Sequence, residues 1–214
     1  MEVGETLYVT ERATWRKWLE QNYREKSEIW LVYYRKASGK PRIPYDEAVE
    51  EALCFGWIDS IVKPIDDERL AQRFTPRRPN SPYSQLNKER LRKLGAQGKV
   101  RSEVLEGVRE LLDEKFEIPP DILERIKANK EAWKNFQRFP DRYKRIRIAF
   151  IEGGRRRPEV FEQRLNHFVK QTALNKRYGS DLGDKEGLAE RCSSPGCDAR
   201  SEARTQGASS SSEP

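Results

Sequence analysis

The chain has 214 residues and a formal net charge of +7, from 42 lysines and arginines against 35 acidic residues. Its hydrophobic fraction of 36% is low for a globular chain, and no apolar run is long enough for a transmembrane helix. One histidine and three cysteines argue against a histidine-rich metal site and a disulfide framework. The N-terminus lacks the basic and then apolar order of a signal peptide, so we expect a cytoplasmic protein without membrane insertion.

Residues 180–214 differ in composition from the rest of the chain. They contain four basic and seven acidic residues, no aromatic residue and a serine-rich end. Such a segment buries too little apolar surface to offset the entropy of ordering, so it predicts a disordered acidic tail. Cys192 and Cys197 in this tail lack the further ligands of a zinc site, and we expect no metal and no cofactor. A single domain is expected over residues 1–179.

The first elements alternate between helix and strand. Apolar residues at helical spacing predict a helix from Glu11, with Thr10 as its N-cap. The run Ile29–Tyr34 is rich in β-branched and aromatic residues and predicts a buried strand. A helix is predicted from Tyr45 to about Phe55, and Gly56 is expected to end it.

Two more strands and a helix are predicted next. Residues 57–62 are expected to form a turn and then a short strand. Over 69–75 the side chains alternate, with Leu70, Gln72 and Phe74 on one side, which indicates a strand of a small antiparallel sheet. Ser81, followed by a proline, predicts the start of a helix that runs to the glycines at 95 or 98.

The C-terminal half, residues 102–179, is predicted to be helical throughout. Helices are expected from Ser102, from Asp121 to Phe139, over Arg142–Ile151 with Phe150 on the apolar face, and from Pro158. Because the strands are confined to the first half, the predicted fold class is α+β, mainly helical, with a small antiparallel sheet in the N-terminal half.

Two strings within a motif block at residues 45–94 resemble one known family. The first is ALCFGWID at 52–59, and the second is RFTPRRPNS at 73–81, followed by Tyr83, Ser84 and the residues Asn87 to Arg90. Their order resembles the bacteriocin-protection proteins of the YdeI or OmpD-associated family, clearly over 30–94 and more weakly over 118–164. The resemblance implies a stress or bacteriocin-tolerance role in bacteria, and it implies no reaction.

The segment TPRRPNS, residues 75–81, is the first candidate site. Its two prolines stiffen the chain, so Arg77 and Arg78 would lose little entropy on binding a phosphate or carboxylate. Ser81 and Ser84 lie at a predicted helix N-terminus, where free N–H groups favour an anion. We therefore expect a small anionic ligand there. The expected ligand-binding residues are Arg77, Arg78, Ser81, Ser84, Asn87, Arg90, Trp57 and Asp59.

Asp59 is the second candidate, and two interpretations of it are open. A carboxylate beside Trp57 in a half-buried turn can act as a general acid or base, which would make the protein an enzyme acting on an anionic substrate. The carboxylate can instead accept backbone N–H groups or pair with Arg77 or Arg78, leaving the segment as a rigid connection. Since the sequence yields no reaction, a binding protein is our first hypothesis and an enzyme the second.

The aromatic rings of the first half also allow two interpretations. Trp57, Tyr33 and Tyr45 can pack in a hydrophobic core, as large rings usually do. They can instead line a ligand-binding cleft. The lone Cys54 lies in an apolar stretch and is interpreted as a small core residue more readily than as a nucleophile.

Two basic clusters raise a third hypothesis. Residues 69–101 hold ten basic residues and one acid, Glu89, and residues 142–157 hold seven and one acid, Glu152. Together they could contact the phosphates of a nucleic acid, although no known nucleic-acid-binding motif is present. Arg77 and Arg78 lying beside Arg145 and Arg155 would favour a large polyanion, whereas separate clusters, with the first inside a closed pocket, would favour a small anion. The oligomeric state does not follow from the sequence.

Overall fold

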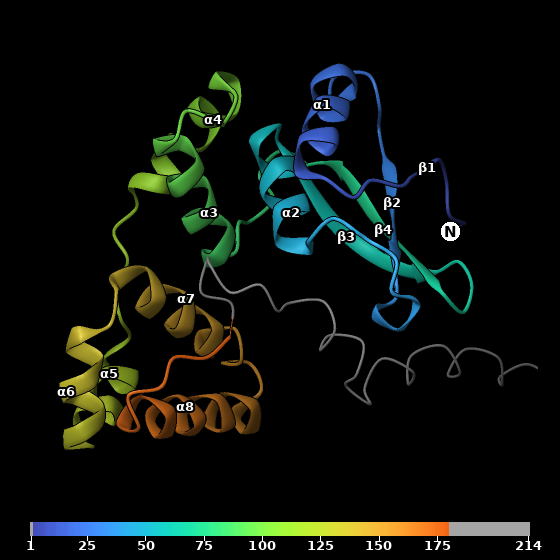
Figure 1. Cartoon of the computed structure of the whole chain (residues 1–214). Helices are drawn as coiled ribbons and strands as arrows, with labels where there is room; N and C mark the ends of the chain where they lie inside the picture. Colours follow the sequence, from blue (N-terminus) through green and yellow to red (C-terminus); the bar gives the residue numbers. More distant parts are fainter. Residues whose placement is uncertain (1, 180–214) are drawn as a thin grey trace, which may run out of the picture.

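The structure of the chain, a computed structural model, describes residues 2–179, which form two groups of elements (Figure 1). The first group, which we call the sheet unit, contains β1 (Thr6–Leu7), α1 (Arg12–Asn22), β2 (Ile29–Tyr34), the 3₁₀ helix η1 (Lys36–Ser38), α2 (Tyr45–Cys54), β3 (Trp57–Pro64), β4 (Arg69–Pro76), α3 (Gln85–Ala96) and α4 (Ser102–Asp113). The second group, the helical unit, contains α5 (Pro120–Lys127), α6 (Lys130–Arg138), α7 (Asp141–Glu152) and α8 (Pro158–Ala173). The predicted tail lies outside the described residues.

The α+β fold class is confirmed, but the sheet is mixed and not purely antiparallel. The strand order is β1-β2-β4-β3, with β2 and β3 both antiparallel to β4. Strand β1 pairs in parallel with β2, through Thr6 opposite Trp30 and Leu7 opposite Leu31. Two paired residues are too short a run for hydrophobic alternation to reveal, which is why the sequence did not predict this strand.

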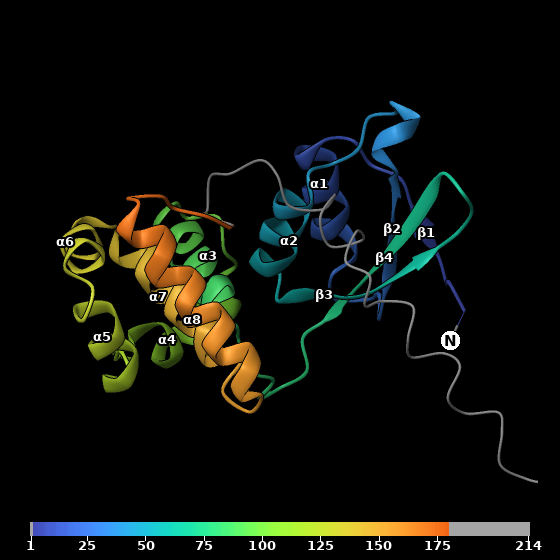
Figure 2. The same ribbon diagram turned by 90° about the horizontal axis from the view of Figure 1, so that it is seen from below.

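Helices α1 and α2 lie over one face of the sheet, and this face carries the first hydrophobic core (Figures 1 and 2). Leu31 and Tyr33 point to it from β2, and Phe74 points to it from β4. Trp15 of α1 packs edge-on against Phe74, with 5.5 Å between ring centroids. Burial of these rings supplies much of the driving force for folding of the unit.

Ion pairs also join α1 to α2. Arg12 and Arg16 of α1 each donate to the Glu51 carboxylate, with an Arg16 Nη1–Oε2 distance of 2.8 Å, and Arg12 also reaches Glu50. Both carboxylates are buried, and charged groups are rarely buried without such partners. The two acidic residues therefore fix the packing of α2, a role that the sequence did not predict for them.

Three predicted helix boundaries were wrong, two of them because another side chain caps the helix. Helix α3 starts at Gln85 and not at Ser81, since Ser84 caps it by accepting the N–H of Asn87 at 3.3 Å. The helix expected from Asp121 to Phe139 is two helices, because the side chain of Asn129 caps α6. Glu11 and not Thr10 is the N-cap of α1, and its side chain makes no capping bond.

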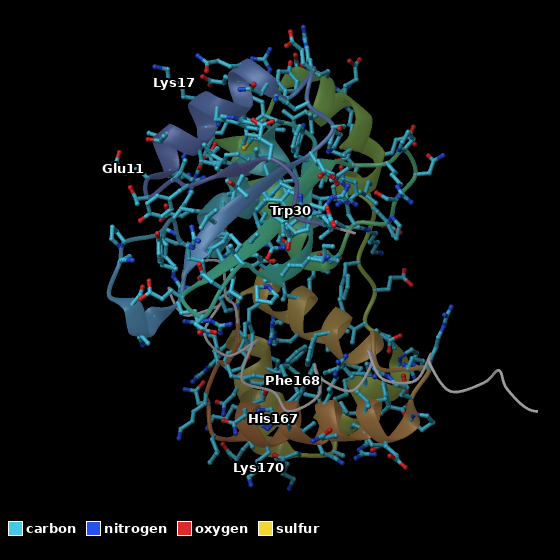
Figure 3. The ribbon with its side chains drawn as sticks, turned by 90° about the vertical axis from the view of Figure 1, so that its right-hand side faces the viewer. Glu11, Lys17, Trp30, His167, Phe168 and Lys170 are labelled. Atoms are coloured by element: carbon cyan, nitrogen blue, oxygen red, sulfur yellow. The ribbon has the colours of Figure 1, made fainter. Side chains whose placement is uncertain are left out.

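The second core lies in the helical unit, and Figure 3 shows Phe168 of this core far from Trp30 of the sheet. It is built from Ile122 and Ile126 of α5, Phe136 of α6 and residues of α7 and α8. Phe150 was predicted on the apolar face of α7, but it is 44% exposed. No helix within residues 2–179 is long and apolar enough to cross a membrane.

The two cores are joined by one buried carboxylate, that of Glu89 on α3. Arg145 of α7 donates to both of its oxygens, from Nε at 2.6 Å and from Nη2 at 2.9 Å. Arg92 of α3 donates to Glu89 Oε1 at 2.7 Å and also to the carbonyl of Leu112, near the end of α4. Glu89 is 2% exposed, so α3, α4 and α7 share one buried ionic centre.

The hydrogen bonds of this centre control the pKa of Glu89. Burial alone would raise the pKa, but the hydrogen bonds from Arg145 and Gln85 outweigh burial and hold it below its usual value of 4.5. A lowered folded-state pKa means that the ionised carboxylate stabilises the fold above the unfolded pKa. This contribution is lost as the pH falls through the lower, folded-state pKa.

We predict that Glu89→Gln lowers the free energy of unfolding at pH 7 by about 3 kcal/mol, because two arginines lose their charged partner. The difference from the wild type should shrink as the pH falls below the unfolded-state pKa of about 4.3 and through the lower folded-state pKa of Glu89. Urea unfolding of both proteins at several pH values measures this. A difference that stays constant down to pH 3 would contradict the assignment.

Candidate functional site

The TPRRPNS segment forms a loop, and the side chain of Arg77 stabilises this loop by hydrogen bonds to its far end. Arg77 Nη2 donates to the Ser81 hydroxyl at 3.0 Å, to the Ser81 carbonyl at 3.2 Å and to the Pro82 carbonyl at 2.9 Å. Its guanidinium also lies 3.7 Å from the ring centroid of Tyr83. Nη2 of Arg77 is thus engaged inside the loop, while its buried Nε has no hydrogen-bond partner among the described residues, and the neighbouring Arg78 is exposed.

The other residues predicted to bind a ligand, Ser84, Asn87 and Arg90, lie at the N-cap and in the first half of α3, and one of them contacts α2. Ser84 is exposed and caps α3, and Asn87 accepts a hydrogen bond from Arg90 Nη1 at 3.0 Å. Arg90 is only 3% exposed, and its Nη2 donates to Asp46 in the first turn of α2. Arg90 therefore ties α3 to α2, and it does not lie in one pocket with Ser84 on the surface.

Trp57 belongs to the core. Its ring is 1% exposed, packs edge-on against Trp18 and donates from Nε1 to the carbonyl of Tyr23 at 3.1 Å. Of the two interpretations given for this ring, core packing describes its position. Trp57 therefore contributes to a site only by supporting strand β3, which starts at this residue.

Asp59 lies on β3 and points to the helix-covered face of the sheet. It is paired with Phe74 of β4, which is paired in turn with Ile29 of β2. Residues directly opposite one another in antiparallel strands share a face. Asp59 therefore lies on the same face as Tyr33, four residues after Ile29, and as Gln72, two residues before Phe74.

Tyr45, the first residue of α2, completes this group. Its hydroxyl donates to Asp59 Oδ2 at 2.6 Å, and Gln72 Nε2 lies 3.4 Å from the same oxygen. Asp59 and Tyr45 are partly exposed, whereas Gln72 is 3% exposed. We call Tyr33, Tyr45, Asp59 and Gln72 the sheet-face cluster. In residues 2–179 Asp59 forms no ion pair with Arg77, Arg78 or any other basic residue.

The hydroxyl of Tyr33 is the unusual member of the cluster. Tyr33 is 1% exposed, and within the described residues its hydroxyl has no hydrogen-bond partner. Burial raises the pKa of Tyr33 far above its usual value, the nearby Tyr45 and Asp59 raise it further, and Arg42 lowers it. Buried tyrosine hydroxyls normally find a partner, because an unpaired buried donor costs about 1–3 kcal/mol.

The sequence motif predicted Asp59 as a site residue, whereas Tyr33 and Tyr45 were expected only as rings of a possible cleft. Gln72 was missed as a site residue, although the signal was present. Gln72 alternates with Leu70 and Phe74 on the same side of β4, so it is a polar residue on a core-facing side. A buried polar side chain among apolar neighbours requires hydrogen-bond partners, and here it reaches Asp59.

The two basic clusters of the sequence meet, but not through Arg77 and Arg78. Arg92 from residues 69–101 and Arg145 from residues 142–157 share Glu89. Further arginines of both clusters are paired with acids, which reduces the positive charge available for a nucleic acid. These pairs are Arg69–Asp66, Arg73–Glu28, Arg90–Asp46 and Arg155 with Asp121 and Glu152.

The remaining predicted features concern metals and the cysteine. Residues 2–179 contain no group of three or more histidine, cysteine or acidic side chains arranged to hold a metal ion. Cys54 is fully buried, and burial raises the pKa of its thiol to about 11, so the nucleophilic thiolate is scarce at neutral pH. Cys192 and Cys197 lie outside the described residues.

Comparison with known families assigns the two halves of the chain differently. Residues 115–175 match the family described as bacteriocin-protection, YdeI or OmpD-associated, and residues 7–107 match a domain of unknown function, DUF8412. The C-terminal segment of the chain is thus similar to the bacteriocin-protection family. The motif strings that suggested this family lie in the other segment. No curated protein and no solved structure is significantly similar to the chain.

The neighbouring Arg77 and Arg78 provide a matched pair of variants. We predict that Arg77→Ala lowers the free energy of unfolding by about 1–3 kcal/mol, because carbonyls of the loop lose their donor. Arg78→Ala should change it by less than about 0.5 kcal/mol, as expected for an exposed surface residue. Chemical denaturation distinguishes the two, and equal effects would show that Arg77 does not hold the loop.

Proposed function

We propose that this chain, whose C-terminal segment matches the bacteriocin-protection family, is a binding protein whose sheet unit takes up a small polar ligand at the sheet-face cluster. The observation that carries the proposal is the buried Tyr33 hydroxyl without a partner, close to the carboxylate of Asp59. A ligand that accepts a hydrogen bond from this hydroxyl would remove the penalty of its burial. The partly exposed Tyr45 and Asp59 form the side from which a ligand approaches.

The acceptor at Asp59 defines the chemistry of the proposed ligand. Both hydrogen bonds to this carboxylate end on Oδ2, so Oδ1 accepts none from the described residues. A carboxylate oxygen favours a donor, and the strongest bonds form when one partner is charged. The ligand we propose therefore presents a hydroxyl or amine to Asp59 and an oxygen to Tyr33. We further propose that its binding serves a bacteriocin-tolerance role, as the family description implies.

From the sequence we expected a small anion to bind at the TPRRPNS segment. This remains a proposal, but fewer of the expected side chains are available to bind the anion. Arg77 and Arg90 are engaged with the loop and with Asp46, so the exposed Arg78 and Ser84 would carry it. Two exposed groups without a shared pocket bind an anion weakly. The sheet-face cluster is the better supported site for this reason.

An enzyme with Asp59 as acid or base is the second candidate, and one observation favours it. The 2.6 Å bond from the Tyr45 hydroxyl to Asp59 is in the range of a charge-assisted O–H···O⁻ bond. Such a pair can pass a proton between a bound substrate and solvent. The same variants test this candidate, because loss of turnover without loss of binding in Asp59→Asn would favour chemistry over binding.

We predict opposite effects of Tyr33→Phe on stability and on binding. Without ligand, the variant should equal or exceed the wild type in unfolding free energy, by up to about 1 kcal/mol, because an unpaired buried hydroxyl is removed. Tyr34→Phe is the matched control, since Tyr34 neighbours Tyr33 and points to the other face of the sheet. Thermal denaturation of the three proteins measures the difference.

Binding is tested by screening polyols, amino alcohols and amino sugars against the full chain by thermal shift. Compounds that stabilise the chain are then titrated by calorimetry into the variants. We expect Tyr33→Phe to weaken binding about fivefold and Asp59→Asn about tenfold or more, with Tyr34→Phe unchanged. Equal affinity in all four proteins, or a Tyr33→Phe variant that is destabilised like a core mutant, would place the ligand elsewhere.

A further inference from the structure

We propose a second ligand site, at the junction of the two units, for a small organic anion such as a phosphate monoester with an apolar body. The site is a hollow of about 390 Å³ between α3, the segment that connects the units, and the first turns of α7. It lies apart from the sheet-face cluster and does not depend on the function proposed there. Its lining residues are Arg92, Glu114, Lys115, Phe116, Ile118, Asp141, Lys144 and Arg145.

The hollow is where the two basic clusters of the sequence meet. Arg92 comes from the first cluster, and Lys144 and Arg145 come from the second, while Lys115 lies in the connecting segment. The lining therefore holds four basic residues against two acidic residues. Basic side chains that converge on a concave surface raise the local concentration of anions.

The two acids of the lining are already engaged by cations. Glu114 accepts a hydrogen bond from Lys88 at 2.5 Å, and Asp141 accepts one from Lys144 at 3.1 Å. Behind the hollow, Glu89 holds Arg92 and Arg145 in place. The acids thus neutralise part of the charge and order the basic side chains, so that an anion meets a positioned group of donors.

Two donors of the hollow are not used by the fold. Glu89 accepts hydrogen bonds from Nε and Nη2 of Arg145, whereas Nη1 of Arg145 donates to no described residue. Lys115 is exposed and forms no hydrogen bond or ion pair within residues 2–179. A phosphate or carboxylate that bridges these two groups would form charge-assisted bonds, the strongest kind available on this surface.

An apolar part of the lining, which we call the apolar wall, indicates an organic anion and not a bare ion. Phe116 and Ile118 line the hollow and are partly buried against the core of the helical unit. Small-molecule sites typically combine an apolar lining with a few placed polar groups, in volumes of about 300–1,000 Å³. A nucleic acid would instead require an extended track of unpaired cations, and much of the positive charge here is paired.

The proposal is tested by calorimetric titration of the full chain with phenyl phosphate and with inorganic phosphate at low salt. We expect phenyl phosphate to bind more tightly, because only it has a ring to place against Phe116 and Ile118. Lys115→Gln should weaken phenyl phosphate binding at least about fivefold. Lys134→Gln removes an equally charged exposed lysine on α6, outside the hollow, and should leave the affinity within about twofold.

Each other result overturns the proposal. If neither compound binds, or if both variants lose affinity equally, the hollow is not an anion site. If inorganic phosphate binds as tightly as phenyl phosphate, the apolar wall plays no part. If a short DNA duplex displaces phenyl phosphate and binds more tightly, with affinity that falls steeply as salt rises, the surface belongs to a nucleic-acid interface. Asp59→Asn should leave phenyl phosphate binding unchanged, which separates this site from the sheet-face cluster.

Discussion

The carboxylate of Glu89 is the constraint on which the arrangement of the molecule depends. It is buried between two units that each have a hydrophobic core, and it is bonded to Arg92 on its own helix and to Arg145 across the junction. A buried ion pair is strongly destabilised when one partner is removed, because the other charge is left without compensation. The arginines therefore hold α3 against α7, and the same contact shapes the hollow beside them.

Glu89 and Asp59 illustrate two uses of buried or partly buried acids in one chain. Both carboxylate oxygens of Glu89 accept hydrogen bonds from Arg145. Both oxygens of Glu51 likewise accept hydrogen bonds, one from Arg12 and one from Arg16. At Asp59 one oxygen takes both bonds, and the nearby Tyr33 hydroxyl takes none. Polar groups that serve only the fold are normally satisfied within it. The buried Tyr33 hydroxyl without a partner, close to a partly exposed carboxylate, is for this reason the stronger argument for a ligand, and the density of arginines in the motif is the weaker one.

The sequence predicted the regular elements well where hydrophobic periodicity is strong. Strand β2 has the predicted bounds, and α2 and β4 agree within two residues. It failed where a local side chain decides a boundary, as Ser84 does for α3 and Asn129 for α6, because several residues nearby could have served as cap. It also misjudged Arg147, which was counted as part of a basic helix surface but is 8% exposed.

The candidate site was only partly predictable for a similar reason. The motif pointed to Asp59, but the partner of a carboxylate depends on strand register and helix placement, which no local pattern contains. Arg77 and Arg90 were expected to bind a ligand because guanidinium groups suit anions. Guanidinium groups also bind backbone carbonyls and carboxylates of the protein itself. In the folded chain Arg77 donates to the Pro82 carbonyl, and Arg90 donates to Asp46. Tyr33 illustrates the reverse case, a core position whose polar atom becomes significant only when its surroundings are known.

A crystal structure of the purified chain, grown with a compound selected by thermal shift, tests the central claim most directly. The account predicts one bound molecule that accepts a hydrogen bond from the Tyr33 hydroxyl and donates one to Asp59 Oδ1, with the bond from Tyr45 to Oδ2 retained. It would be contradicted by a Tyr33 hydroxyl bonded directly to another protein group, or by a single enclosed water in a space too small for any larger molecule.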